Sequence, residues 1–402
     1  MYNNPKWASG GKPEAQRPGG CVKRGRKGAP AKEKGVLLSM KLKEMKGWQK
    51  RRLFITLILV VGVSAAFLIS TCTALYQDKV SEKDYWDAAL TPSDSALAHL
   101  DEIDDNATPV SVGTYLETFK EISLKNSSYR MEFLLWFRWK GDPELDMAYN
   151  FRIYKGTVNK MQVVKDYHGE DGENYQLLRV DASVFKNYWT IRFPLESHQL
   201  RMYIESNYTA DRVVFVNDKE NCGINGNLDI PGYNLVRHDT GIFTVESNST
   251  NGDPELSGTA INSEFVTALE VNRDSWGLYL KCFIALFGTT TWVLITLFIN
   301  TYHRVDPLSM IPAALFGTVS NIMVGANLLP DVLQLGLLEF VNVWGVMTIL
   351  SVAMVIINVN RIRNQYEDKD FAAFYGRVMF YTILALVVIG HIALPLSALL
   401  VA

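Results

Sequence analysis

Histidine, cysteine and acidic side chains are the groups most able to carry chemistry, and in this sequence they are dispersed. The six histidines stand far apart, the four cysteines form no metal-binding pair, and no nucleophile or phosphate-loop motif is present. Residues 168–173 (HGEDGE) contain carboxylates that could hold a divalent cation. Their spacing differs from that of a calcium-binding loop, so we expect a solvated turn. The sequence therefore predicts a protein that is not an enzyme and that carries no metal or other cofactor.

Charge is strongly segregated along the 402 residues. Residues 1–52 hold 15 Lys and Arg against three Glu, whereas residues 76–276 hold 19 Lys and Arg against 33 Asp and Glu. The first segment is rich in Gly and Pro and is predicted to be a disordered basic cytoplasmic tail. The second segment is long enough to bury a core of its own. It contains one of the four cysteines, so no internal disulfide can stabilise it.

Five apolar segments are candidates to cross a membrane, because about 20 apolar residues span a bilayer core of about 30 Å. They cover residues 53–75, 277–300, 307–328, 337–360 and 378–402. Lys50, Arg51 and Arg52 stand directly before the first segment, so the positive-inside rule predicts a cytoplasmic N-terminus and an outside C-terminus. We expect an integral protein of the plasma or inner membrane, surrounded by lipid and not bound to nucleic acid. The first segment is either a retained anchor or a cleaved signal sequence.

The segment after the first candidate span has the pattern of a β domain, with alternating or aromatic-rich stretches separated by Gly, Asn, Asp and Pro. We expect strands at residues 110–122, 129–139, 175–182, 188–193, 200–205, 212–217, 233–238 and 265–271, and a short helix within 79–104. The predicted fold class is a mixed β + α membrane protein. An antiparallel β-sandwich ectodomain (76–276) is followed by a four-helix transmembrane bundle (277–402), and an extra N-terminal membrane helix (53–75) precedes both.

Several stretches occur in an order shared with a known family. They are residues 110–115 (VSVGTY), 133–139 (FLLWFRW), 193–200 (FPLESHQL), 268–273 (ALEVNR) and 327–330 (NLLP). Together they resemble the pentameric ligand-gated ion channels, the Cys-loop receptor superfamily, in the form of a bacterial-type member that lacks the disulfide. The resemblance covers residues 110–402. Glu196 stands where the family usually has Asp, and Pro312 lies inside the expected pore helix.

The resemblance implies a homopentameric channel for inorganic ions, gated through its β-sandwich, with a small external ligand as a further partner. The second helix of the bundle then lines the pore. Helical spacing gives the pore-lining stripe Ser309, Ala313, Phe316, Ser320 and Met323. A ring of Phe316 side chains would close the pore by dewetting. Pro312 is accommodated if the helix begins near residues 309–311, because proline is tolerated in a first turn. The same stripe could instead pack against neighbouring helices.

Other residues receive roles from the same resemblance. Arg304 and Asp306 would set ion selectivity. We expect weak cation selectivity, because Asp306 is nearer the helix start and shares the sign of the acidic ectodomain. The predicted domain-coupling residues are Phe193, Pro194, Glu196, Arg273, Leu329 and Pro330, with an ion pair between Glu196 and Arg273. Candidate aromatic ligand contacts are Trp136, Trp139 and Tyr233, which could equally pack in the core of the sandwich.

Two other interpretations are open on the sequence. The chain could be a non-conducting membrane receptor or adhesion protein that uses the same sandwich for binding, with a dry and tightly packed helix bundle. It could also be a membrane enzyme, for which Asp331, Glu339 and Asn342 form a polar cluster near the membrane face without a nucleophile or metal pattern. A water-accessible stripe at residues 309–323 distinguishes the channel from both.

Overall fold

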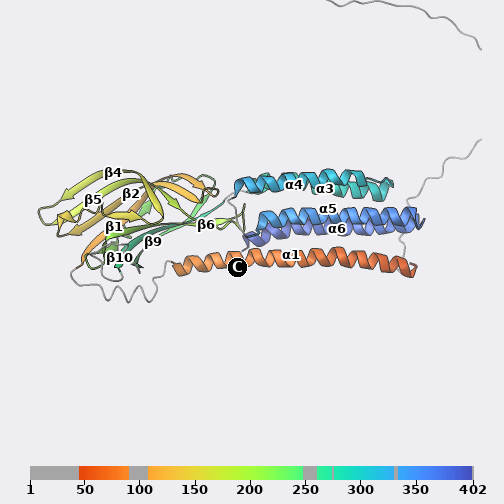
Figure 1. The fold of residues 1–402 in the computed structure, drawn as a ribbon, viewed down its shortest axis with the longest axis horizontal. Coiled ribbons are helices and arrows are strands. Elements are labelled where there is room, and N and C mark those ends of the chain that lie inside the picture. Colours follow the sequence, from red (N-terminus) through yellow and green to blue (C-terminus); the bar gives the residue numbers. More distant parts are fainter. Residues whose placement is uncertain (1–44, 90–106, 248–259, 274–275, 330–333, 401–402) are drawn as a thin grey trace, which may run out of the picture.

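Two β-sheets and a set of long helices occupy opposite ends of an elongated molecule in the computed structural model (Figure 1). The structure describes residues 45–89, 107–247, 260–273, 276–329 and 334–400. Most of the predicted basic tail (1–52) therefore lies outside the described residues. The order of a β domain followed by helices was predicted from the sequence and is confirmed.

The β domain consists of two sheets. The first has the strand order β4 (Gly156–His168), β5 (Glu173–Phe185), β2 (Ser128–Lys140), β1 (Thr108–Ser123) and β7 (Val213–Asn217), with β8 (Gly223–Ile224) also paired to β1. The second has the order β3 (Phe151–Ile153), β6 (Ser197–Thr209), β10 (Ala260–Asn272) and β9 (Asn234–Ser247). Pairing between the described strands is antiparallel, except that β1 pairs in parallel with β7 and β8.

The two sheets share one apolar core. Phe133 and Phe137 of β2 belong to the same buried cluster as Leu200 of β6 and Phe265 and Leu269 of β10. Side chains alternate between faces along a strand, so each sheet presents an apolar face to the other. This arrangement is consistent with the expected β-sandwich. The cluster continues into the helices, so the two halves of the molecule are packed together as well as linked by the chain.

Two expectations for the strands were wrong. Residues 188–193 form no strand but end in turns, in which the Phe193 amide donates to the Thr190 carbonyl. The next residue, Pro194, has no N–H to donate to a ladder. Strand β4 was not predicted at all. It is exposed over most of its length, so its sequence lacks the apolar alternation by which a strand is recognised.

The helical part comprises α3 (Trp276–Phe298), α4 (Ile311–Leu328), α5 (Leu337–Asn364) and α6 (Lys369–Leu399), beside α1 (Gly47–Ala89). Turns at Ile299–His303 and Leu308–Met310 connect α3 to α4. Within the described residues, four helices are long and apolar enough to cross a membrane: α1, α3, α5 and α6. The third apolar segment, which is the second helix of the expected bundle, forms α4, an 18-residue helix that begins at Ile311 and so has Pro312 in its first turn.

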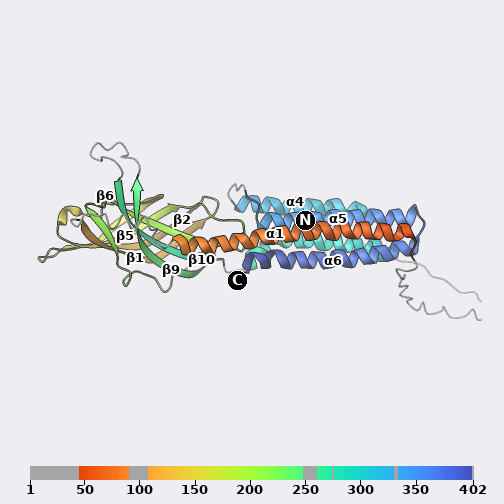
Figure 2. The ribbon, with the colours of Figure 1, turned by 90° about the horizontal axis from the view of Figure 1, so that it is seen from below.

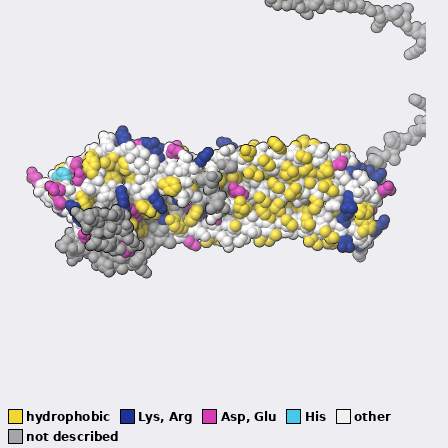
Figure 3. Space-filling view, viewed as in Figure 1, with side chains coloured by type: hydrophobic (Ala, Val, Ile, Leu, Met, Phe, Trp, Pro, Cys, Tyr) yellow, Lys and Arg dark blue, Asp and Glu magenta, His cyan; other side chains and the backbone are white. Residues whose placement is uncertain are grey.

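The surface of the helices is apolar over most of its length (Figure 3). Ile55 and Ile58 of α1, Ile284 of α3 and Ile392 of α6 are each more than half exposed. Basic side chains gather at the end of the bundle farthest from the β domain (Figure 3). Soluble proteins rarely expose so continuous an apolar surface. The helices are therefore compatible with an integral membrane protein.

Helix α1 is longer than the predicted anchor. It runs from Gly47 to Ala89, beyond the predicted limits of 53 and 75, along α6 and α5 and up to the β domain (Figure 2). The sequence contains no Gly or Pro between residue 63 and Pro92, so nothing ends the helix where its apolar stretch ends. The short helix expected within 79–104 is thus the continuation of α1. Residues 90–104 of that range lie outside the described residues.

Close packing of α6 on α5 yields a test of this arrangement. An added Cβ at Gly390 would lie 2.3 Å from an atom of the Trp344 ring. We expect Gly390→Ala to lower the free energy of unfolding by about 1–3 kcal/mol, the usual cost of overpacking. In the matched variant Gly62→Ala, the added Cβ meets nothing within 4 Å and helix propensity favours Ala. Thermal unfolding of the detergent-solubilised protein measures both. A lower midpoint for Gly62→Ala than for Gly390→Ala would contradict the packing.

Candidate functional site

A partly buried ion pair lies in the β domain close to the helices. Arg273 follows β10 and Glu196 precedes β6, and because these strands are paired with Asn272 opposite Ser197, the two side chains are neighbours. Arg273 Nε lies 2.7 Å from Glu196 Oε1, and the Arg273 amide donates to the Glu196 carbonyl. The Tyr233 hydroxyl donates to the same carboxylate oxygen over 3.1 Å. The ion pair predicted from the sequence is confirmed.

The charge state of this cluster follows from its burial. Burial alone would raise the pKa of Glu196, but the positive charge of Arg273 opposes this effect and the pKa lies below its ordinary value, so the carboxylate is ionised at neutral pH. Burial lowers the pKa of His198, which is therefore a neutral imidazole. Its Nε2 lies 3.7 Å from Glu196 Oε1, too far for a hydrogen bond. Glu196 Oε2 also has no partner among the described atoms.

The loop before β6 contacts the start of α5. The Leu337 amide donates to the Ile191 carbonyl over 2.6 Å, and an added Cβ at Gly336 would lie 2.4 Å from that same oxygen. Phe193 is buried beside this contact, under the Arg273 guanidinium at 5.8 Å from its ring centre. The coupling residues Phe193, Glu196 and Arg273 are thus brought together.

The remaining predicted coupling residues are only partly described. Pro194 is buried and follows Phe193 through a cis peptide bond. Leu329 packs against the core cluster that contains Phe193. Pro330 lies outside the described residues, so its distance from Phe193 stays a prediction.

A second junction was missed by sequence reasoning. Arg192 is 2% exposed, and its guanidinium pairs with Asp78 at 2.9 Å and with Glu82, both from α1. Lys79 of α1 donates to Ser197 over 3.1 Å. The sequence held one indication of this junction: Asp78 and Glu82 are four residues apart, which places both on one face of a helix. It could not identify Arg192, because the ion pair spans 114 residues.

Packing of α4 fixes which of its faces points outward. An added Cβ at Gly317 would lie 2.2 Å from Thr289 of α3, and one at Gly325 would lie 2.1 Å from Leu338 of α5. Asn321 donates to Asn342 of α5 over 2.8 Å, and both side chains are buried. The glycines permit close helix contact and the amide pair sets the rotation of α4.

The predicted stripe lies on the outward face of α4. Each of its five residues is exposed in the single chain, and the Phe316 side chain is 77% exposed. The residues are Ser309, Ala313, Phe316, Ser320 and Met323. These five side chains therefore do not pack against other helices of the same chain.

The two predicted selectivity residues lie before α4. Arg304 has a left-handed backbone with φ 57° and is exposed, as is Asp306. Asp306 Oδ1 accepts a hydrogen bond from the Leu308 amide over 3.1 Å. This contact holds the Asp306 carboxylate at the start of the turn that leads into α4, whereas Arg304 projects from the preceding turn.

The three candidate aromatic contacts have different surroundings. Trp139 is 2% exposed in the core, and its indole donates to the Asp142 carbonyl. Tyr233 is buried against Glu196 and Arg273. Trp139 and Tyr233 therefore fit the alternative that these aromatic residues pack in the core of the sandwich. Trp136 instead lines a surface pocket of about 440 Å³, and its indole donates to Asp218 over 3.0 Å. That pocket also contains Tyr115, Arg138 and Tyr175.

The histidine of the acidic turn at residues 168–173 is exposed and has two polar neighbours. His168 lies 3.3 Å from Asp166, and its other ring nitrogen contacts Asn174. No group of three or more His, Cys, Asp or Glu side chains within the described ranges is placed to hold a metal ion.

The buried pair yields a second prediction. Glu196→Gln removes the counterion of Arg273, and breaking one side of a buried pair costs about 3–5 kcal/mol of stability. We expect the double variant Glu196→Gln, Arg273→Met to recover part of that loss, since no unpaired charge is left behind. The matched control is Asp239→Asn in the exposed Lys219–Asp239 pair, with an expected change of at most about 1 kcal/mol. Chemical unfolding followed by tryptophan fluorescence measures all three. Equal losses for Glu196→Gln and Asp239→Asn would refute a structural role for the pair.

Comparison with known proteins gives no family assignment: no protein-family description matches the sequence, and no curated protein is similar to it.

Proposed function

We propose that this chain is a subunit of a homopentameric ion channel that is gated through its extracellular β-sandwich and is weakly cation-selective. The observation that carries the proposal is the outward face of α4, where small and polar side chains alternate with the exposed Phe316. Ser309 and Ser320 give this face hydroxyl groups that suit contact with water, and Ser320 also donates to the Phe316 carbonyl of its own helix over 3.0 Å. Five copies of this face around an axis would line a water-filled path with apolar rings at Phe316 and Met323.

Membrane orientation follows from the distribution of charge. The end of the bundle away from the β domain carries Arg304, Arg361, Arg363, Lys369 and Arg377. By the positive-inside rule, this end is cytoplasmic and the β domain is outside, in a plasma or inner membrane. The C-terminal end of α6 lies beside the β domain (Figure 1), which agrees with an outside C-terminus.

The position of α1 is compatible with such a ring. It packs on α6 and α5, on the opposite side of the bundle from α4 (Figures 1 and 2). At its inner end Trp48 stacks on Tyr366 with ring centres 5.0 Å apart, and Gln49 donates to Asp368 over 2.7 Å. These contacts support a retained helix instead of a cleaved signal sequence. In the proposed pentamer, α1 lies at the periphery and leaves α4 free to face the axis.

Gating through the β domain has a defined physical route in this proposal. The Glu196–Arg273 pair holds the end of β10 where the chain passes into α3, and the Ile191–Leu337 hydrogen bond ties the same loop to α5. Both α3 and α5 pack closely on α4 at Gly317 and Gly325. A shift of the loop therefore reaches the helix that lines the proposed pore.

The apolar ring gives a test of the proposed gate. Phe316→Ser removes the dewetted constriction, and we expect the resting conductance to rise by about tenfold or more. The control is Ile322→Ser, an exposed residue on another face of α4. Currents are recorded in planar bilayers, with pentamer assembly checked by native mass spectrometry. If Phe316→Ser assembles normally and leaves resting and evoked currents unchanged, Phe316 is not the gate. A stable monomer would favour the receptor or adhesion interpretation.

Selectivity gives a further prediction. The ectodomain is acidic, but its field reaches only about 8 Å at physiological salt, so the charge nearest the inner mouth decides permeation. Asp306 is held there by the Leu308 amide. We expect Asp306→Asn to move the sodium-to-chloride permeability ratio toward unity and Arg304→Gln to increase it. Reversal potentials in a NaCl gradient measure both. A wild-type reversal potential near the chloride equilibrium value would show that Arg304 controls the path instead.

A further inference from the structure

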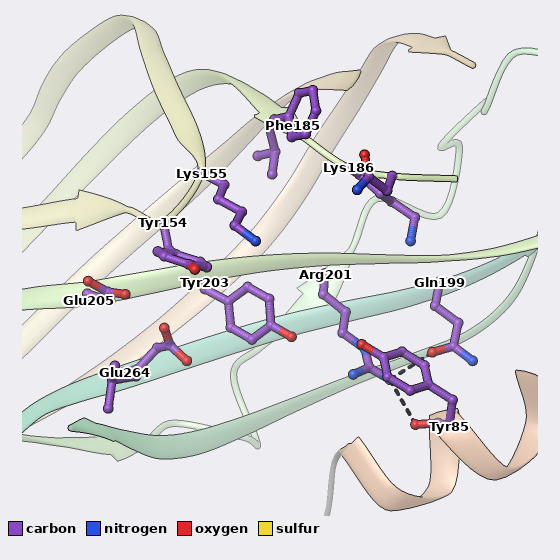
Figure 4. Close-up of a pocket in the computed structure, with 13 residues that line it drawn as sticks. Tyr85, Tyr154, Lys155, Phe185, Lys186, Gln199, Arg201, Tyr203, Glu205 and Glu264 are labelled. Atoms are coloured by element: carbon purple, nitrogen blue, oxygen red, sulfur yellow. Dashed lines mark hydrogen bonds between the residues drawn. The ribbon is translucent and has the colours of Figure 1, made fainter. Parts of the chain in front are cut away.

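A pocket of about 450 Å³ lies where the end of α1 meets the β domain (Figure 4). Four segments contribute to the part of it called here the α1–β6 pocket: Tyr85 from α1, Lys155 from the β3–β4 turn, Lys186 after β5, and Arg201 and Tyr203 from β6. Its size is within the usual range for small-ligand sites, about 300–1,000 Å³. It is separate from the α4 stripe and from the Trp136 pocket.

Three cations of this pocket have no carboxylate partner. Within the described residues, Lys155 and Lys186 form no ion pair and contact only the rings of Tyr154 and Tyr188. Arg201 is 8% exposed and donates to neutral oxygens, the Tyr85 carbonyl and the Gln199 side chain. Its Nε is buried and has no hydrogen-bond partner. None of these three cations therefore has an ion-pair partner among the described residues.

The two glutamates at the other end of the pocket do not supply that charge. Glu205 is paired with Arg152, outside the α1–β6 pocket. Burial and the neighbouring Glu205 raise the pKa of Glu264 to about 8, so Glu264 is protonated at neutral pH. Burial and the nearby Arg201 also lower the pKa of Lys186 to about 8, which reflects the cost of an ammonium without a counterion. An anionic ligand would remove this cost.

We propose that the α1–β6 pocket binds a small organic dicarboxylate that bridges α1 and β6. Lys155 and Lys186 come from separate segments that line the pocket, whereas the Arg201 guanidinium lies against Tyr85 of α1 (Figure 4). Cations held on separate segments suit two carboxylates held apart on a short carbon chain. The Tyr203 hydroxyl is a further donor beside them.

Calorimetric titration of the full detergent-solubilised chain at pH 7 and constant ionic strength tests the proposal, with succinate as the probe. We expect saturable binding of one succinate per chain, and acetate binding weaker by at least about tenfold, because acetate makes half of the charged contacts. Succinate should also slow amide hydrogen exchange in residues 79–89 of α1 and leave residues 311–323 unchanged.

Variants identify the binding residues. Lys155→Gln and Lys186→Gln should each weaken succinate binding by about tenfold or more. The Lys155 side chain is exposed, so its loss leaves the fold intact. The matched control Lys219→Gln removes an exposed lysine elsewhere on the β domain and should leave the affinity unchanged.

Three results would overturn the inference: no saturable heat with succinate, wild-type affinity in Lys155→Gln, or tighter binding of inorganic phosphate than of succinate. None of these readouts depends on conduction. A chain that binds succinate but carries no current would contradict the proposed channel and leave the ligand site standing.

Discussion

The ion pair between Glu196 and Arg273 is the contact on which the arrangement of the two halves depends. It lies where the last strand of the β domain leads toward the first helix of the bundle, with the Glu196 side chain fully buried and the Arg273 side chain 14% exposed. Charges in such a place are stable only while they remain paired, so separation of β10 from the β6 entrance is strongly opposed. The unpartnered Glu196 Oε2 and His198 Nε2 leave the cluster incompletely satisfied, as expected of a junction that is able to rearrange.

Helix α1 adds a second connection between the same two halves. Its outer end binds Arg192 through Asp78 and Glu82, only a few residues before Glu196, and its inner end is fastened to the α5–α6 turn through Trp48 and Gln49. At 43 residues, α1 is about 65 Å long, enough to pass the whole bundle and reach the β domain. A movement of the loop before β6 is therefore felt both by the bundle and by α1, and a ligand in the α1–β6 pocket would stiffen that second connection.

Local patterns predicted much of this fold, and interactions between distant residues account for the rest. Apolar runs located the long helices, and the tolerance of proline in a first turn allowed a helix beginning near residue 311. The contact between Glu196 and Arg273 was expected only from the resemblance to a known family, and pairing of the strands next to them explains it. The exposed strand β4 had no pattern to find. The length of α1 and the partners of Arg192 depend on packing between residues more than 100 positions apart, which no local spacing reveals. The outward rotation of α4 likewise depends on where Gly317 and Gly325 meet neighbouring helices.

The proposed pore is tested most directly by measuring which positions of α4 are accessible to water. In a background without the native cysteines, single cysteines at residues 309–325 are treated with a charged, membrane-impermeant thiol reagent in proteoliposomes, and the rate of modification is measured. The account predicts reaction at positions 309, 313, 316, 320 and 323, and protection at the buried positions 314, 318 and 321. Lipid cannot carry the charged reagent to the outward face. Protection of the whole stripe under resting and activating conditions would contradict a pore lined by α4.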